Sequence, residues 1–219
     1  MAERRLNSLT AREEEYLMKY GALPHEREEL LSYVQEHFPF SQKSLDRAMA
    51  ILEQLEWREI IFTLYLVPKP TPRPRTDGHH FYVKGAADNK KLIKKYIDRH
   101  VVATRCEVTM QAFLPTPLSQ MSNVEIYLAE AGLIYPIHTA DVDNLMKTYL
   151  DMITGHLIIN DNLVTSGYLE KQFSVLPRLE VNLRYQTGYD SRYNEKRMLR
   201  SKSFQEVMSE LQQEIHMTG

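Results

Sequence analysis

The sequence of 219 residues has one cysteine, one tryptophan and no long run of apolar side chains. The single Cys106 excludes an internal disulfide, which favours a reducing, intracellular environment. No segment approaches the roughly 20 apolar residues needed to span a bilayer. The first residues, Met-Ala-Glu-Arg-Arg-Leu-Asn, lack the apolar core of a signal peptide. We therefore expect a cytoplasmic protein that does not enter a membrane.

The net charge of -2 is also small, but the basic side chains are unevenly distributed. Residues 69–105 carry ten lysines and arginines and three aspartates, a local excess of seven positive charges (10 − 3). A basic region inside an otherwise acidic chain indicates a surface that faces a polyanion. On charge alone, a solvated helix face with scattered arginines is an equal alternative.

The apolar side chains repeat with two periods, which predict a mixture of helices and strands. A hydrophobic content of 43% with 26% charged residues is typical of a folded domain. Helical spacing predicts three short helices before residue 58, and strict alternation predicts strands farther on. Strands are predicted at 59–67, 107–113, 164–173 and 179–185. Helices are predicted at 86–99, from Asp143 to Gly155 and in the tail. Residues 118–130 fit neither period.

This order of elements indicates an α+β fold with three regions. We expect a helical extension over 1–58, a mixed-sheet domain over 59–187 and a helical tail over 188–219. The extension has no basic recognition helix, so we interpret it as a packing element or a binding surface for another protein. The amphipathic tail must bury its apolar stripe on its own domain, on the extension or on a second copy.

A proline-rich arm follows the first predicted strand. Prolines occupy every second position from Pro68 to Pro74, interleaved with Lys69, Arg73 and Arg75. Because proline has no N–H group, this segment cannot be a central strand. We expect an extended, polyproline-like arm that presents its three basic side chains without regular pairing.

Three acids and a lysine accompany the predicted helix that ends at Gly155. Asp141 and Asp143 stand at its start, Lys147 lies one turn in, and Asp161 follows in a later turn. Side chains two apart on an extended backbone point the same way, so Asp141 and Asp143 suit one Mg²⁺ ion. If the later turn folds back, Asp161 joins them, and each carboxylate pair would repel by about 4 kcal/mol at about 4 Å. A divalent cation would relieve this repulsion, and Lys147 could neutralise charge on a phosphate.

Each of these residues also has an ordinary structural explanation. Asp143 can serve as the N-cap of the helix, which is worth about 1 kcal/mol. Lys147 and Asp151 can form an exposed pair one turn apart, worth a few tenths of a kcal/mol. Asn160-Asp161-Asn162 is also a common turn composition. The combined pattern is more specific than its parts.

The combined pattern resembles the signature of the RusA-type Holliday junction resolvases. The resemblance is carried by Asp141-Val-Asp-Asn-Leu-Met-Lys-Thr-Tyr-Leu-Asp151 and by Ile158-Ile-Asn-Asp-Asn-Leu-Val164. In addition, Tyr65-Leu-Val-Pro-Lys-Pro-Thr-Pro-Arg-Pro-Arg75 resembles the opening strand of that family and its proline- and arginine-bearing segment. The similarity covers about 60–185 and leaves out both helical ends.

The resemblance implies a small mixed α/β domain that works as a homodimer and nicks two strands of a four-way DNA junction. It assigns Asp141, Asp143 and Asp161 as catalytic acids that bind Mg²⁺, with Mn²⁺ as a possible substitute, and Lys147 as the catalytic lysine. Lys69, Arg73 and Arg75 are expected to contact DNA.

The main alternative is a DNA-binding or scaffold protein on the same fold that does not cleave DNA. A weaker alternative is a metal-dependent phosphohydrolase acting on nucleotides.

Overall fold

The structure, a computed structural model, describes most of the chain between residue 27 and residue 189 and short pieces of the tail. The described residues are 27–38, 41–70, 75–76, 81–82, 86–189, 200, 205–207 and 209–210. Contacts divide the chain into two compact units, Met1–Glu53 and Gln54–Gly219. The predicted boundary at residue 58 lies a few residues beyond this division.

The first unit contains two described helices, α2 (Arg27–His37) and α3 (Gln42–Gln54). The hydroxyl of Ser41 accepts a hydrogen bond of 3.2 Å from the backbone N–H of Ser44, which caps the start of α3. No residue of α3 is buried. A helix predicted nearer the amino terminus lies outside the described residues.

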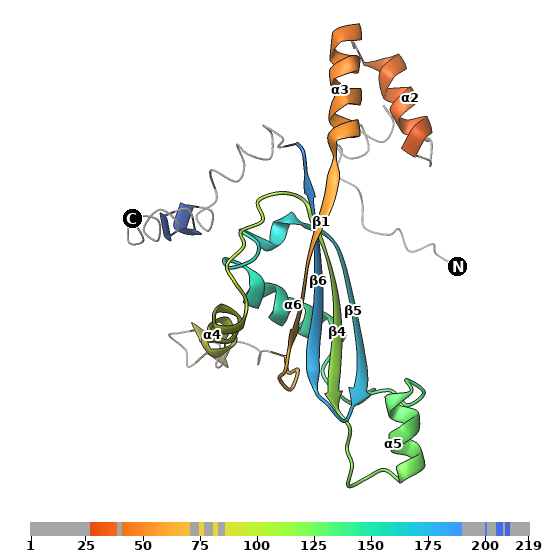
Figure 1. Cartoon of the computed structure of the whole chain (residues 1–219), viewed down its shortest axis with the longest axis vertical. Helices are drawn as coiled ribbons and strands as arrows, with labels where there is room; N and C mark the ends of the chain where they lie inside the picture. The colour runs from red at the N-terminus through yellow and green to blue at the C-terminus, as the bar shows by residue number, and fades with distance from the viewer. Residues whose placement is uncertain are drawn as a thin grey trace, which may run out of the picture. The chain divides into compact units, whose positions relative to one another are not determined.

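The second unit is built on a four-stranded mixed sheet (Figure 1). The strand order is β1-β6-β4-β5, in which β6 pairs antiparallel with both β1 and β4, whereas β4 and β5 are parallel. The predicted α+β class with a mixed sheet is therefore confirmed. The strand bounds are β1 Glu56–Leu64, β4 Cys106–Pro115, β5 Val164–Ser174 and β6 Arg178–Thr187.

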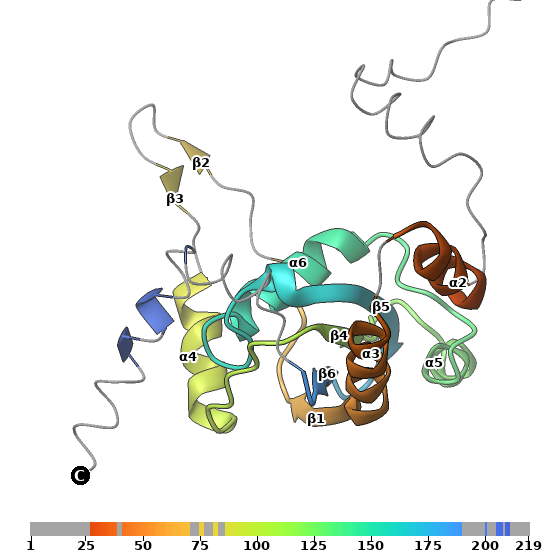
Figure 2. The ribbon, with the colours of Figure 1, turned by 90° about the horizontal axis from the view of Figure 1, so that it is seen from above.

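Two helices, α4 (Ala86–Tyr96) and α6 (Val142–Ile153), lie against the same face of this sheet (Figure 2). Alternate residues of the strands point toward them, as the period of two predicts. The core they share is almost fully buried and includes Val108, Met110, Ala112, Leu179, Val181, Leu183, Ile93, Leu145, Tyr149 and Met152. The sheet thus holds α6 rigidly by its apolar side.

The proline-rich arm leaves the sheet after β1 and leads to a short hairpin. Strand β2 (Arg75–Thr76) pairs antiparallel with β3 (Phe81–Tyr82). Arg75 is therefore paired with Tyr82, and the expectation that the whole arm lacks regular pairing is wrong at this position. Residues 71–74, with Arg73, lie outside the described part of the chain.

The region with no clear period contains a short helix, α5 (Asn123–Glu130). Its start is a capping box: the Ser122 hydroxyl accepts from the Glu125 N–H, and the Glu125 carboxylate accepts from the Ser122 N–H at 2.7 Å. This pairing satisfies two helix-end donors. The Ser122 and Glu125 spacing was the sequence signal that the apolar pattern obscured.

The described part of the tail packs on its own domain. Val207 is buried, and its Cγ2 lies 3.9 Å from the position that a Cβ on Gly155 would occupy. Glu210 also forms an ion pair of 3.4 Å with Arg99, just after α4. Among the three docking sites left open by the sequence, the structure places this segment on the second unit.

Within the described ranges, no helix has the length and apolar character that a bilayer crossing requires.

Candidate active site

The first predicted acid, Asp141, occupies the N-cap position of α6. Its backbone is extended, with φ -65° and ψ 147°, but its side chain makes no capping hydrogen bond to the helix. Instead, the Asn144 side-chain amide donates to one carboxylate oxygen of Asp141 over 3.5 Å. The alternative that made Asp143 the N-cap is therefore wrong. The exposed Asp141 carboxylate remains accessible for another ligand.

Asp143 and Lys147 lie on the exposed face of α6. Asp143 is in the first turn of the helix, so the expectation that Asp141 and Asp143 share one extended segment is wrong, and only Asp141 has an extended backbone. Lys147 follows Asp143 by four residues, which places the two side chains on neighbouring turns of one face. None of the ion pairs found among the described residues includes Lys147 or Asp151. The alternative explanation of Lys147 and Asp151 as an exposed ion pair is therefore not supported.

Asp161 begins a short 3₁₀ helix, Asp161–Leu163, directly before β5. The side chain of Asn160 accepts a hydrogen bond of 2.8 Å from the Asn162 N–H and so closes the turn. This local bond satisfies the backbone without the Asp161 side chain, which is exposed. The segment has the turn structure that its composition predicts.

The packing of α6 on β5 separates Asp161 from the start of α6. Lys171 contacts Ala140 near the helix start, Met146 packs on Gly167, and Ile158 follows the helix end beside Ile153. The helix and the strand thus run in opposite directions (Figure 1). At about 3.3 Å per strand residue, the beginning of β5 lies roughly 20 Å from Lys171.

The three predicted acids do not come together in the described structure. A search of the described residues for three or more acidic, histidine or cysteine side chains able to hold a metal ion finds no such group. Asp141 and Asp143 remain neighbours at the start of α6, and Asp161 lies toward its other end. The role of Asp161 in the same metal site therefore stays a prediction.

The chemistry of Asp141 and Asp143 nevertheless fits magnesium. Both are exposed carboxylates, which supply the hard oxygen ligands that Mg²⁺ prefers. This ion keeps several waters and is commonly held by one or two carboxylates together with phosphate oxygens. The acid pair at the start of α6 thus has the ligand chemistry for such an ion, to which a bound phosphate would add further oxygen ligands.

Two side chains that sequence reasoning missed support α6. The Lys171 ammonium donates to the backbone carbonyl of Ala140 over 2.9 Å and to the Thr139 hydroxyl over 3.3 Å. The Tyr149 hydroxyl accepts a hydrogen bond of 3.1 Å from the backbone N–H of Lys69. A lone lysine in a strand gives no sequence signal. A tyrosine on an apolar helix stripe gives a weak one, because its buried hydroxyl needs a partner.

Burial controls the ionisation of two groups in this domain, Tyr149 in α6 and Cys106 at the start of β4. Tyr149 is 2% exposed, and desolvation raises the pKa of its hydroxyl to about 12, although the hydrogen bond from Lys69 lowers it slightly. Burial also raises the pKa of the Cys106 thiol to about 12, with a smaller contribution from the charge of Glu107. Both groups are therefore neutral at physiological pH.

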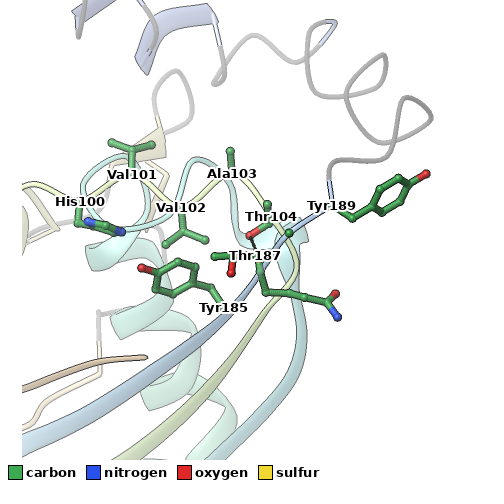
Figure 3. Close-up of a pocket in the computed structure, with 10 residues that line it drawn as sticks. His100, Val101, Val102, Ala103, Thr104, Tyr185, Thr187 and Tyr189 are labelled. Atoms are coloured by element: carbon green, nitrogen blue, oxygen red, sulfur yellow. Dashed lines mark hydrogen bonds between the residues drawn. The ribbon is translucent and has the colours of Figure 1, made fainter. Parts of the chain in front are cut away.

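A separate cavity of about 350 Å³ lies between residues 100–104 and 185–189 (Figure 3). The rings of His100 and Tyr185 lie there with their centroids 5.5 Å apart and their planes tilted by 50°, and Tyr189 points away from them. Among the predicted residues whose side chains the structure describes, neither the acids nor Lys147 and Lys69 line this cavity.

Comparison with known proteins agrees with the motif. A family model described as "Endodeoxyribonuclease RusA" matches residues 65–184. This match covers 120 of the 219 residues (184 − 65 + 1) and includes Asp141, Asp143, Lys147 and Asp161. A search of curated proteins finds no significant match. Because the family match spans more than half of the sequence, the chain belongs to the RusA family of endodeoxyribonucleases.

Proposed function

We propose that the protein is a Mg²⁺-dependent endodeoxyribonuclease that resolves four-way (Holliday) junctions in DNA recombination and repair. Membership of the RusA family supports nuclease activity on branched DNA. The observation that carries the proposal is the pair of exposed acids at the start of α6, with Lys147 one turn farther on. We expect the enzyme in the cytoplasm, where the free thiol of Cys106 would stay reduced.

The residues have distinct roles in this proposal. Asp141 and Asp143 hold Mg²⁺ (or Mn²⁺) through their carboxylates, and Asp161 supplies a further acid. The bound ion lowers the pKa of a water and stabilises charge on the attacking and leaving oxygens. Lys147 neutralises charge that develops on the phosphate. All four side chains are exposed, and those of Asp141, Asp143 and Lys147 lie together on α6, where a phosphodiester in a DNA strand can reach them.

The basic arm supplies the contacts to the DNA backbone. Lys69 is exposed at its base, and Arg73 and Arg75 follow at alternate positions. Arginine and lysine bind phosphate oxygens and fix the register of a protein on DNA. These contacts are sequence-independent, so their contribution to affinity falls as the salt concentration rises.

Paired nicking requires two active sites. Each protomer carries one group of predicted acids, so a homodimer would place one site against each of two opposed strands. A homodimer has a two-fold rotation axis, which matches the approximate two-fold symmetry of a four-way junction. Two symmetric cuts leave two ligatable duplexes.

A labelled synthetic four-way junction, incubated with the purified protein and Mg²⁺ or Mn²⁺, tests the proposal. The expected products are two nicked duplexes cut at symmetric positions, and none when EDTA replaces the metal. A linear duplex of the same sequence serves as the control substrate. Junctions that stay intact with both metals would contradict the proposal.

A second candidate is a DNA-binding or scaffold protein on the same fold that does not cleave. It is favoured by the lack of a three-acid metal group among the described residues. This candidate predicts junction binding that weakens steeply with salt, and no strand scission with either metal. The same assay, read for binding as well as cleavage, distinguishes the two functions.

A further inference from the structure

The arm that carries the predicted DNA contacts is tied to the predicted catalytic helix by one hydrogen bond. The backbone N–H of Lys69 donates to the Tyr149 hydroxyl over 3.1 Å, although the two residues are 80 positions apart. Tyr149 belongs to α6 and lies two residues after Lys147. The bond thus connects a residue of the basic arm with the helix that bears Asp141 and Asp143.

Within the segment 68–70, the sequence makes this bond the available backbone anchor. Pro68 and Pro70 flank Lys69 and have no N–H group. Lys69 therefore provides the one backbone donor in the segment 68–70, and that donor is bonded to Tyr149. Pro68 is itself buried, whereas the Lys69 side chain is exposed. The chain consequently leaves the core at Lys69 with its backbone held and its ammonium group in solvent.

The other partner of the bond is rigid. Tyr149 is 2% exposed and belongs to the buried core between α6 and the sheet. Its ring cannot follow the arm if the arm moves, because close-packed core side chains have few alternative positions. Proline also restricts the backbone on both sides of Lys69. A short, well-anchored connection of this kind sets the position of Lys69 relative to α6.

We propose that Tyr149 is a positioning residue, which holds Lys69 at a set place beside α6 so that a DNA backbone bound by Lys69 meets the acids of that helix. The inference rests on the proposed nuclease function. Tyr149 does not touch the substrate, and its hydroxyl acts through the backbone of Lys69.

Replacement of Tyr149 by phenylalanine removes the acceptor and keeps the ring in the core. The first measurement is hydrogen exchange of the Lys69 amide in the DNA-free protein, and we expect the Tyr149→Phe variant to exchange faster. The second is steady-state cleavage of the four-way junction. We expect KM to rise about three- to tenfold, the range set by the net worth of one hydrogen bond, with kcat nearly unchanged.

Thr154→Val is the matched control on the same helix. The Thr154 hydroxyl donates to the Leu150 carbonyl over 2.8 Å and does not contact the arm. This variant also loses one hydroxyl hydrogen bond of α6, but it should keep the Lys69 amide protected and leave KM at the wild-type value. An equal rise of KM in both variants would show a general loosening of α6 and would overturn the positioning role.

Two other results would also overturn the inference. One is an unchanged exchange rate at Lys69 in Tyr149→Phe, and the other is faster exchange with unchanged KM and kcat. Failure of the proposed function has a different signature, since the wild-type protein would then leave the junction uncut, whether or not it bound it. In that case the positioning role would be wrong as well, while the exchange rate of the Lys69 amide would still show whether the Lys69–Tyr149 hydrogen bond forms.

Discussion

The ammonium group of Lys171 in β5 donates a hydrogen bond of 2.9 Å to the backbone carbonyl of Ala140, the residue before Asp141. It reaches the Thr139 hydroxyl as well, at 3.3 Å. The segment that leads into α6 is thereby fastened to the sheet, and a positive charge lies close to the start of the acidic helix. The position of Asp141 thus depends on a side chain 30 residues farther along the chain (171 − 141).

Replacement of Lys171 by methionine should destabilise the fold and reduce cleavage. The loss of a charged donor should lower the free energy of unfolding by about 1 kcal/mol, and displacement of Asp141 should slow cleavage several-fold. Urea unfolding and junction cleavage measure the two effects. Lys43→Met removes an exposed lysine from α3 and should change neither quantity. Full activity in Lys171→Met would show that this bond does not position Asp141.

Replacement of Asp143 by asparagine should abolish cleavage while junction binding is kept or strengthened. The substitution removes a metal ligand, and it also removes a negative charge that repels the DNA phosphates. Cleavage and gel-shift assays at one salt concentration measure both effects. Asp151→Asn, an exposed change of the same type on the same helix, should cut like the wild type. Cleavage by Asp143→Asn at the wild-type rate would remove that residue from the mechanism.

Mg²⁺ should raise the melting temperature of the DNA-free protein. An ion that binds the folded state and not the unfolded state stabilises by mass action, by about 2.7 kcal/mol at 100 times its dissociation constant. Asp141→Asn and Asp143→Asn should each reduce this rise. If Asp161 binds the same ion, Asp161→Asn will reduce it to the same extent. An unaltered rise in Asp161→Asn would instead assign the ion to the α6 acids alone.

The protein should lose stability as the pH rises from about 9 to about 12. Burial raises the pKa of Tyr149 from 10.0 and that of Cys106 from 9.0, each to about 12. The unfolded chain therefore releases these protons first, and unfolding becomes easier until the folded groups also ionise. The shift of Tyr149 corresponds to about 3 kcal/mol.

Urea unfolding at pH 8 and pH 11 checks this expectation. The Tyr149→Phe variant should lose less stability between the two values than the wild type, because it has no hydroxyl to ionise. A Tyr168→Phe variant, altered at an exposed tyrosine, is the control and should follow the wild type. Equal losses in the wild type and Tyr149→Phe would show that the buried hydroxyl does not control the alkaline transition.

Short-range patterns were sufficient to predict most elements of the second unit. Leu179, Val181 and Leu183 alternate with polar residues, and they lie buried in β6 as that period requires. The apolar stripe of α6 likewise identified the helix that packs on the sheet. Period alone was insufficient for α5, where the capping residues were the better signal.

Residue patterns alone were sufficient to predict the α+β class, the apolar faces and the family motif, because each is expressed within a few turns or one strand. Which distant segments meet depends instead on the tertiary packing. Strand β5 pairs parallel with β4, and α6 runs in the opposite direction to β5. Lys171 therefore reaches Ala140 at the start of the helix, while Asp161 lies toward its other end. Packing of the whole α6 stripe sets these contacts and the bond from Lys69 to Tyr149. A local sequence pattern carries no information about such long-range packing.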